Sequence, residues 1–523
     1  MGAQRIAFRT DGSLLMGSGH VMRCLTLAEA LKAQGAECHF ISRAHPGHLL
    51  KLIRQRGFAV TALPVELPQP PGDTQAASAN PKEPVHASWL GCDWQTDAEQ
   101  TRAILVRLQP DWLVVDHYAL NHRWENVQRL SVGRIMVIDD LADRTHDCDL
   151  LLDQNLVAQM HTRYADKVPA ACGLLLGPKY ALLQPIFAKL HDRMPPREGN
   201  VQRIFIFFGG ADRDNLTGRS LSAFLSLNWP DIEVDIVITD KCPHEAVIRQ
   251  QAAGYANIHL HSGLQTLAPL MAKADLAIGA GGATSWERLC LGLPTLVVIL
   301  AENQRPIADE LGQRGLIRWL GHQDAVDQTT IARALDKLIQ KGLDEDWSLR
   351  CFATVDGKGV NRVCAALNVA ATTHLRVRHA KLVDEALLLE WANDPTTRSN
   401  AFSSELITVA AHRIWFRNRL RNLDGCRLYI VETTDGVPLG QVRFEHSEPA
   451  WEVHYALAPI FRGRGLGRPL LKAAMLKLRA DIGRGALIFG QVKDGNHSSR
   501  KIFESLGFEF QFNAGVAMYQ RAL

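Results

Sequence analysis

The sequence lacks the features that would place the protein in a membrane, on nucleic acid or around a metal ion. It contains no window of about twenty apolar residues, so a membrane-spanning helix is not expected. The formal net charge is only +3, which gives no general electrostatic case for nucleic-acid binding. The ten cysteines lack CxxC or CxxH spacing, and we expect reduced, mostly buried thiols and no metal site.

The N-terminus shows no targeting signal. The strand-like segment RIAFRT, residues 5–10, begins almost at once and leaves no room for a signal peptide. Ile6 stands where an N-myristoylation motif requires Ser or Thr. We therefore expect a cytoplasmic protein with no membrane or nucleic-acid partner.

The 523 residues are enough for two or three domains. Short apolar strands alternate with helical patterns, and the alternation starts again near residue 203. This predicts two doubly wound α/β domains, 1–190 and 191–370, which bind ligand at the carboxyl ends of their strands. A mixed α+β domain is expected over 373–523, where the DG of TTDGVPLG indicates a hairpin. The Pro-rich segment 66–84 predicts a surface loop.

A glycine-rich turn leads into a helical pattern in GSGHVMRCLTLAEAL, residues 17–31. A P-loop would carry Lys followed by Ser or Thr where this chain has His20. Free amides and the positive dipole at a helix N-terminus disfavour an imidazolium. A neutral His20 could therefore act as a general base while amides near Gly19 hold an anionic substrate. Simple capping of the helix by His20 is the alternative.

A second glycine-rich turn, GAGGATSWE, follows another predicted strand. Its glycines would let the backbone approach a diphosphate, and its hydroxyls and helix amides could bind the diphosphate oxygens. A carboxylate one turn into the helix could accept hydrogen bonds from ribose hydroxyls. An ordinary βα turn with a capping hydroxyl is the alternative. The candidate contacts in this turn and on the next strand-end loop are Gly281, Gly282, Thr284, Ser285, Glu287, Asn303 and Gln304.

Six ordered blocks, among them GSGHVMRCLTLA, LVVDHYALNHRWE and GGATSWERLCLGLPTLVV, resemble the UDP-sugar hydrolases of pseudaminic acid biosynthesis over roughly residues 4–365. The resemblance implies a GT-B fold, with two Rossmann-like domains facing a cleft. It also implies hydrolysis of UDP-2,4-diacetamido-2,4,6-trideoxy-β-L-altropyranose. His20 would be the base that deprotonates the attacking water, and UDP would leave from an inverted anomeric centre without a metal.

Further candidate site residues come from the ENQ segment, 302–304, and from predicted strand-end loops. Asn303 matches a substrate-binding position of that family. Asp11, Asp116, His117 and Tyr118 follow predicted strands and could line the sugar site. Asp116 could equally be a structural hydrogen-bond acceptor.

The segment LAPIFRGRGLGRPLL, residues 457–471, has an R-x-x-G-x-G arrangement after a strand broken by Pro459. Successive amides in such a turn can hold a pyrophosphate. Together with VKDGNHSSRKIFESLGFEF downstream, it resembles the GNAT-type N-acetyltransferases over about residues 374–520. The resemblance implies acetyl-CoA as co-substrate, with contacts at Leu457, Arg462, Gly463, Arg464, Gly465, Leu466, Gly467, Asn496, Ser499 and Phe503.

Phe503 departs from the GNAT pattern, which often has a tyrosine there as general acid. A phenylalanine cannot donate a proton, so the thiolate must be protonated by water or another group. Glu445, Glu452 and His454 lie on or beside the central strands and are candidates for accepting the amine proton.

The front of this domain, EWANDPTTRSNAF, is similar to the GNAT subset that acts on nucleotide-linked amino sugars. In the pseudaminic pathway that activity acetylates the 4-amino group immediately before the hydrolase step. The sequence therefore predicts a bifunctional enzyme that uses UDP-linked amino sugars, acetyl-CoA and water. The alternatives are a UDP-sugar glycosyltransferase fused to an acetyltransferase, and a hydrolase whose C-terminal domain senses acetyl-CoA without turnover.

Overall fold

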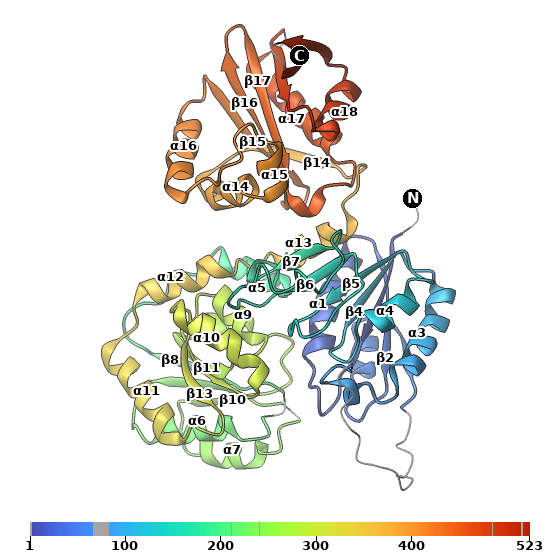
Figure 1. The fold of residues 1–523 in the computed structure, drawn as a ribbon. Helices are drawn as coiled ribbons and strands as arrows, with labels where there is room; N and C mark the ends of the chain where they lie inside the picture. Colours follow the sequence, from blue (N-terminus) through green and yellow to red (C-terminus); the bar gives the residue numbers. More distant parts are fainter. Residues whose placement is uncertain (1–2, 66–82, 211, 240, 484, 514–515) are drawn as a thin grey trace. The chain divides into compact units, whose positions relative to one another are not determined.

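The computed structural model describes residues 3–65, 83–210, 212–239, 241–483, 485–513 and 516–523 (Figure 1). The chain divides into two compact units, Met1–Cys364 and Ala365–Leu523. The first unit contains residues 1–190 and all but the last six residues of the expected domain 191–370. The second unit begins at Ala365, inside the helix Gly359–Asn368. The predicted loop at 66–84 lies outside the described residues except for its last two positions. Within the described residues, no helix combines the length and apolarity needed to cross a bilayer.

The first sheet has seven parallel strands in the order β3-β2-β1-β4-β5-β6-β7. Chain order reverses between β1 and β4, and such a switch point is where open α/β sheets bind ligands. The strands are β1 (Arg5–Thr10), β2 (Glu37–Arg43), β3 (Ala59–Leu63), β4 (Trp112–Asp116), β5 (Arg134–Ile138), β6 (Leu150–Asp153) and β7 (Gly173–Leu176). The helices are α1 (Gly19–Ala33), α2 (Leu50–Gln55), η1 (Ala87–Leu90), α3 (Trp94–Leu108), α4 (His122–Gln128), η2 (Pro178–Tyr180) and α5 (Pro185–His191).

The second sheet has six parallel strands in the order β10-β9-β8-β11-β12-β13, with the corresponding reversal between β8 and β11. Figure 1 shows helices flanking each of these sheets. The strands are β8 (Arg203–Phe207), β9 (Glu233–Val237), β10 (Ile258–His261), β11 (Leu276–Ala280), β12 (Thr295–Ile299) and β13 (Arg318–His322). The helices are α6 (Leu216–Leu225), α7 (Glu245–Ala252), α8 (Ala268–Lys273), α9 (Thr284–Cys290), η3 (Glu302–Gln304), α10 (Arg305–Gln313), α11 (Gln328–Lys341), α12 (Glu345–Thr354) and α13 (Gly359–Asn368).

Burial explains the composition of these strands. All residues of β4, β11 and β12 are buried, as expected for parallel strands covered by helices on both faces. Polar side chains such as Asp116 lie where these strands end, at the carboxyl edges of the two sheets.

The second unit contains one mixed sheet in the order β14-β15-β16-β17-β18-β20-β19, in which only β17 and β18 run parallel. The strands are β14 (Leu375–His379), β15 (Cys426–Thr433), β16 (Pro438–Ser447), β17 (Ala450–Leu457), β18 (Leu487–Val492), β19 (Glu509–Asn513) and β20 (Val516–Ala522). The helices are η4 (Leu382–Asp384), α14 (Glu385–Ala392), α15 (Pro395–Asn400), α16 (Val409–Arg421), η5 (Pro459–Phe461), α17 (Gly467–Ile482) and α18 (His497–Ser505).

The predicted fold class is confirmed: two parallel Rossmann-like sheets of GT-B type precede a mixed α+β domain. The DG hairpin is also present, because β15 and β16 pair antiparallel across it. The C-terminal pair β19 and β20 was not expected from the sequence, although Phe510 and Phe512 alternate with polar residues along β19.

Candidate active sites

The first site lies where β1 and β4 end side by side. β1 leads through a short loop into α1, which places His20 in the first helical turn, and Asp116 is the last residue of β4. Because the two strands are neighbours, their ends meet at one sheet edge. The Nδ1 atom of His20 lies 2.6 Å from Oδ1 of Asp116.

Arg23 fixes the charge state of Asp116. It lies one turn after His20 on α1 and donates to both carboxylate oxygens, from Nε to Oδ2 over 2.6 Å and from Nη2 to Oδ1 over 2.7 Å. Burial opposes ionisation of Asp116, but Arg23 and His20 outweigh it and hold the pKa of this carboxyl well below its usual range.

An ionised carboxylate can only accept hydrogen bonds, so the contact with Asp116 places a proton on Nδ1 of His20. Nη2 of Arg23, which also can only donate, lies farther from Nδ1, at 3.4 Å. In the neutral ring with its proton on Nδ1, the lone pair lies on Nε2, which is the form that a general base requires. The sequence left the role of Asp116 open and did not identify Arg23, although its i+3 spacing from His20 on one helix is a usable signal.

A second carboxylate, Asp140, supports the same group from the loop after β5. It accepts hydrogen bonds from Nη1 of Arg23 at 2.7 Å, the hydroxyl of Tyr118 at 2.6 Å and Nδ2 of Asn155 at 2.7 Å. The rings of Tyr118 and His20 meet edge to face with centroids 4.5 Å apart. Burial and the nearby Asp140 charge raise the pKa of Tyr118 well above its usual value, so it stays a phenol.

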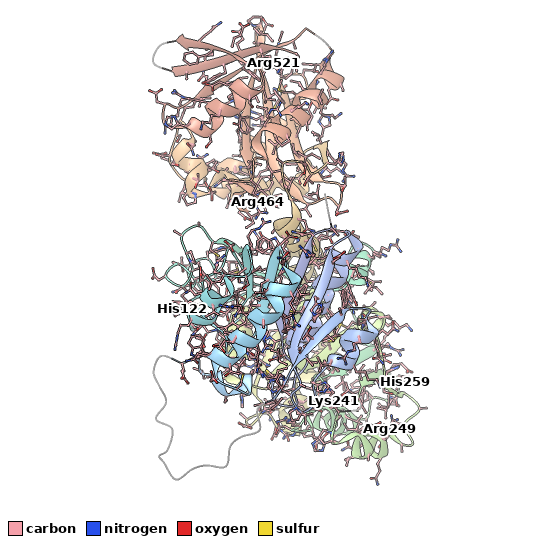
Figure 2. All side chains as sticks on the ribbon, turned by 90° about the vertical axis from the view of Figure 1, so that its right-hand side faces the viewer. His122, Lys241, Arg249, His259, Arg464 and Arg521 are labelled. Atoms are coloured by element: carbon pink, nitrogen blue, oxygen red, sulfur yellow. The ribbon has the colours of Figure 1, made fainter. Side chains whose placement is uncertain are left out.

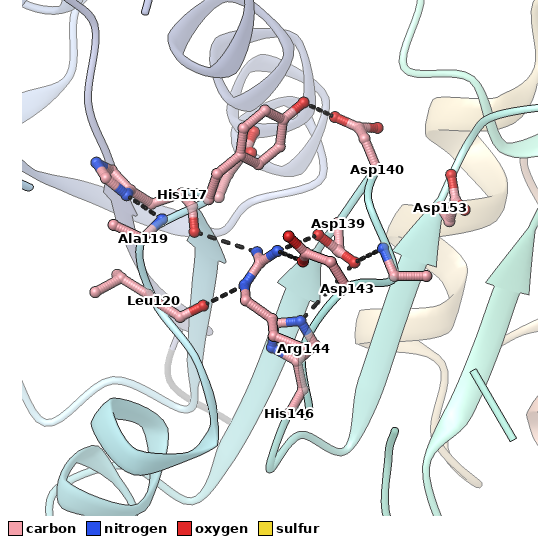
Figure 3. Close-up of polar contacts among 12 residues, drawn as sticks. His117, Ala119, Leu120, Asp139, Asp140, Asp143, Arg144, His146 and Asp153 are labelled. Atoms are coloured by element: carbon pink, nitrogen blue, oxygen red, sulfur yellow. Dashed lines mark hydrogen bonds and ion pairs between the residues drawn. The ribbon is translucent and has the colours of Figure 1, made fainter. Parts of the chain in front are cut away.

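Arg144 braces the loops after β4 and β5 (Figure 3). Its Nε atom donates to the carbonyl oxygen of Leu120 over 2.7 Å, and its Nη1 atom lies 3.0 Å from Oδ1 of Asp139. The other oxygen of Asp139 accepts from the amide of Ala142. Although burial opposes it, the positive charge of Arg144 holds the pKa of Asp139 below its usual range. A paired charge network thus fixes the loops that carry the site.

An aromatic wall, made of His86, Trp89 and Tyr118, stands beside His20. Trp89 stacks on Tyr118 at 5.9 Å between ring centroids, and His86 contacts both rings, at 4.4 and 5.4 Å. His86 and Trp89 come from η1 and the residue before it. They were not predicted, because they share no motif with the strand-end loops they join.

Asp11 and His117 are more buried than expected for residues that line a substrate site. Asp11 is fully buried, and its Oδ1 accepts from Nη1 of Arg9 and from the amide of Arg43, both over 2.6 Å. His117 is 2% exposed, and its Nδ1 accepts from the amide of Ala119. Both residues have structural partners here, so direct contact with a substrate stays a prediction for them.

The second glycine-rich turn joins β11 to α9 and is organised by Arg288. This buried guanidinium donates to the carbonyl of Ala280 over 2.7 Å, to Oγ of Ser285 over 3.0 Å and to Oγ1 of Thr284 over 3.2 Å. Both hydroxyl oxygens accept in these bonds, so each hydroxyl can still donate a hydrogen bond to another partner. A Cβ on Gly281 would lie 3.1 Å from Ile299, so this close approach favours glycine.

Glu287 has a buried carboxylate oxygen, Oε2, without a hydrogen-bond partner in the described part of the chain. Burial raises the pKa of Glu287 to about 7, against the effect of the neighbouring Arg288. Gln304 accepts from the amide of Leu300 over 3.0 Å and lies against the glycines of the turn, whereas Asn303 is exposed. An unsatisfied buried acceptor is costly, and ligand hydroxyls would relieve that cost.

The strand-end loops of the two sheets touch. Arg213, after β8, donates from Nη2 to the carbonyl oxygen of Leu14, after β1. A Cβ on Gly210 would lie 4.0 Å from Oγ of Ser18, the residue before α1. The carboxyl edges of both sheets therefore face a common region of the first unit.

In the second unit, the turn before α17 exposes backbone amides. Gly463 and Gly465 have φ angles of +73° and +72°, a conformation that favours glycine and makes anion-binding concavities. A Cβ on Gly467 would lie 2.3 Å from Ile502 of α18, so glycine also permits close packing there. The predicted residue Leu466 is buried beneath this turn.

The two arginines of this turn are already engaged. Arg462 donates to Asp394 over 2.5 Å and to Thr397 over 2.8 Å. Arg464, labelled in Figure 2, donates to the carbonyl oxygen of Ala366 over 2.5 Å. The guanidinium groups brace the turn, and its amides are the groups best placed to receive an anion.

The strands β17 and β18 separate halfway along. Only Ala450–Glu452 pair with Leu487–Phe489, although β17 continues to Leu457. Beyond Glu452, the edge of β17 on the side of β18 thus has no strand partner in the described residues. An extended ligand could add hydrogen bonds to this edge. Asn496 caps α18 by accepting from the amide of Ser499.

The predicted acetyl-CoA contact Phe503 lies in the core. It is 2% exposed, stacks on Tyr519 at 5.3 Å and meets Phe508 edge to face at 4.9 Å. Contact of its side chain with the cofactor stays a prediction.

The candidate bases Glu445, Glu452 and His454 lie on the face of the sheet opposite to Phe503. The Nε2 atom of His454 lies 3.6 Å from Oε2 of Glu452 and 3.9 Å from Oε2 of Glu445, and it is buried without a hydrogen-bond partner in the described residues. Burial and Arg443 lower the pKa of His454 to about 4, so its ring is neutral at physiological pH. Among the described residues there is no cluster of three metal-ligating side chains.

Comparison with known proteins finds a family match in the second unit and a relative that spans nearly the whole chain. Residues 374–509 match the family described as an acetyltransferase (GNAT) domain. The second unit therefore carries a GNAT acetyltransferase domain. An uncharacterized protein of Methanocaldococcus jannaschii is 23% identical over 522 residues, which cover 97% of this chain and 96% of that protein.

Two further relatives match shorter parts of the chain. The UDP-2,4-diacetamido-2,4,6-trideoxy-β-L-altropyranose hydrolase of Campylobacter jejuni is 24% identical over 312 residues, 60% of this chain and 97% of that protein. A spore coat polysaccharide biosynthesis protein of Bacillus subtilis is 28% identical over 200 residues, 36% of this chain and 57% of that protein. The GT-B unit is thus related to a UDP-sugar hydrolase.

Proposed function

We propose that this chain is a bifunctional enzyme of nonulosonic acid biosynthesis. Its GNAT domain transfers an acetyl group from acetyl-CoA to the 4-amino group of a UDP-linked amino sugar. Its GT-B unit then hydrolyses the resulting UDP-2,4-diacetamido-2,4,6-trideoxy-β-L-altropyranose to the free sugar and UDP. The observation that carries the hydrolase assignment is the contact of 2.6 Å between Nδ1 of His20 and the ionised Asp116, which leaves Nε2 of the ring for the water.

In the hydrolysis step, Nε2 of His20 accepts a proton from water as the oxygen attacks the anomeric carbon. Asp116 stabilises the imidazolium that forms, and Tyr118 and Arg23 keep the ring and carboxylate in place. The bond to the diphosphate oxygen breaks on the opposite face of the sugar, so the anomeric centre inverts. The exposed edge of the aromatic wall would hold the apolar face of the sugar.

UDP would leave toward the turn before α9. The free protons of Thr284 and Ser285 and the amides of Gly281 and Gly282 would bind its diphosphate oxygens. The unpartnered Oε2 of Glu287 supports this placement, because ribose hydroxyls are donors that this buried acceptor lacks.

In the acetyl-transfer step, acetyl-CoA would lie along the open edge of β17 with its pyrophosphate on the amides of the turn at Gly463–Gly467. The acceptor amine would approach from the side of His454, whose neutral ring can take the amine proton directly or through water. Glu452 at 3.6 Å would stabilise the resulting imidazolium.

Phosphorus NMR tests the order of the two steps. The full-length protein is incubated with the UDP-linked 2-acetamido-4-amino-2,4,6-trideoxy sugar, with and without acetyl-CoA, and with the diacetamido sugar as a control. We expect UDP from the amino sugar only when acetyl-CoA is present, and UDP from the diacetamido sugar in both cases. UDP from the amino sugar without acetyl-CoA would contradict the order, and none from any sugar would contradict the hydrolase assignment.

A further inference from the structure

The acetyl-transfer reaction needs a proton donor for the departing thiolate, and Phe503 cannot provide one. The structure places another phenol close to that residue. Tyr455 of β17 contacts the ring of Phe503 at 5.9 Å between centroids, nearly perpendicular to it at 73°. Its hydroxyl donates to Oγ of Ser499 on α18 over 3.0 Å.

The position of Tyr455 along β17 matches the place where the thioester would lie. The last β17 residue that pairs with β18 is Glu452, so Tyr455 stands where the two strands have separated. Its bond to Ser499 spans from the open strand edge to the first turn of α18. A ligand running along this edge toward the turn before α17 would pass the phenol.

Strand alternation separates the acid from the base. Successive side chains of a strand point to opposite faces, so Tyr455 faces the core formed with α17 and α18, whereas His454 faces the side of α16. Tyr455 is packed against that core together with Phe503, and His454 is paired in register with Arg443. One face of β17 thus offers a proton donor and the other a proton acceptor.

We propose that Tyr455 is the general acid of the acetyltransferase domain and that Ser499 positions it; this rests on the proposed function. When the tetrahedral intermediate collapses, the carbon–sulfur bond breaks and its electron pair moves to sulfur. The hydroxyl of Tyr455 turns from Ser499 toward the sulfur and gives it the phenol proton, while the Ser499 hydroxyl donates to the phenol oxygen. The phenolate regains a proton from solvent through the Ser499 hydroxyl. The proton lost by the amine passes to His454 and then to solvent. The active site thus takes up one proton from solvent and releases one in each turnover.

Burial supports this role, since it raises the pKa of Tyr455 to about 12 against the effect of Ser499. The phenol is therefore protonated throughout the physiological range. Such a donor can also stabilise the developing thiolate by a hydrogen bond before the proton is transferred.

The test measures CoA release by the full-length protein from acetyl-CoA and the UDP-linked 4-amino sugar. CoA is quantified by chromatography, because the ten cysteines of the chain would react with a thiol reagent. We expect Tyr455→Phe to lower kcat by about a hundredfold or more, the usual contribution of general acid catalysis. The KM for acetyl-CoA should stay within about threefold, because the phenol acts in the transition state.

Tyr519→Phe is the matched control. Tyr519 also touches Phe503, and its hydroxyl contacts Glu504 instead of Ser499, so this variant should keep kcat within about threefold. Ser499→Ala should lower kcat less than Tyr455→Phe. Unchanged kcat in Tyr455→Phe, or a loss confined to KM, would overturn the inference. No CoA release by the unmodified protein would instead contradict the proposed acceptor.

A second measurement is independent of the acceptor. The thiolate absorbance of bound CoA is titrated with pH in the unmodified protein and in Tyr455→Phe, as a difference against protein alone. A phenol that donates to sulfur should give bound CoA a lower thiol pKa in the unmodified protein. Identical titrations would place Tyr455 away from the sulfur and overturn the inference.

Discussion

The two candidate bases, His20 and His454, differ in how far their surroundings are satisfied without ligand. At the GT-B site, Asp116 and Asp140 each accept hydrogen bonds from several donors, and Arg23 links the two carboxylates. At the GNAT site, Nε2 of His454 and Nε of Arg443 are buried without hydrogen-bond partners among the described residues. The hydrogen bond that orients His20 thus exists before a substrate arrives, whereas Nε2 of His454 has no hydrogen-bond partner until a ligand supplies one.

The difference follows from the chemistry that each site would perform. Activation of water needs a base of fixed tautomer, which Asp116 provides through a bond that exists in the free protein. Transfer between two bound molecules needs room for both, which the separation of β17 from β18 provides at the cost of open backbone and unpaired side chains. The predictions below probe each half of this comparison.

The largest expected effect is that of His20→Phe on UDP release. Removing the base should lower kcat by at least about a hundredfold, while UDP binding by calorimetry is kept, because the turn before α9 is untouched. The matched control His161→Phe replaces an exposed histidine in the same unit and should leave kcat unchanged. Turnover of His20→Phe within about tenfold of the unmodified enzyme would remove His20 from the base role.

Asp116→Asn should come next. The amide can hydrogen-bond either tautomer of His20, so the lone pair is no longer confined to Nε2, and Arg23 loses one of its two carboxylate partners. We expect kcat for UDP release to fall roughly tenfold to a hundredfold. Nitrogen NMR of the histidine rings would report the tautomer, and an unchanged His20 signal with unchanged kcat would contradict the pairing.

Gly465→Asp should weaken acetyl-CoA binding by at least about tenfold, because a carboxylate would enter the turn that receives the pyrophosphate. Gly465→Ala is the matched control: it carries the same backbone strain at a φ of +72° but no charge. Calorimetry with acetyl-CoA compares them. Equal affinities of the Asp and Ala variants would place the pyrophosphate elsewhere.

The smallest effect concerns pH. Burial and Arg443 lower the pKa of His454 to about 4 from a usual value near 6.5, so the folded state binds this proton less readily than the unfolded state. The contribution to stability is complete above about pH 6.5 and is lost as pH falls toward about 4. His454→Gln should lose less protection of the β17 amides on acidification.

Amide hydrogen exchange of β17 at pH 7.5 and pH 4.5, corrected for intrinsic rates, measures this difference. His446→Gln, an exposed histidine at the end of β16, is the control and should behave like the unmodified protein. If His454→Gln and the unmodified protein lost protection equally, His454 would not titrate as described. The partial exposure of the side chain keeps the expected effect small.

Much of this architecture was predictable from short-range patterns. Apolar runs such as those of β4 and β12 indicated buried parallel strands, and glycines before helical patterns indicated the turns at His20 and Thr284. These signals depend on local backbone geometry and on burial of whole strands, which a sequence displays directly. The C-terminal pair β19 and β20 was not predicted, and the sequence does not show that β20 is the strand that adds to the edge of β18.

The sequence by itself determined the two Rossmann-like sheets, the GNAT domain, the helical position of His20 and the substitution that makes Phe503 unable to donate a proton. Only the tertiary structure decided that Asp116 and Arg23 lock the His20 ring, that Trp89 joins Tyr118, and that Tyr455 reaches Ser499. Each of these pairs joins residues that are distant in sequence or belong to different elements. The order of strands in each sheet and the separation of β17 from β18 bring these residues together, and the spacing of residues along the chain predicts neither.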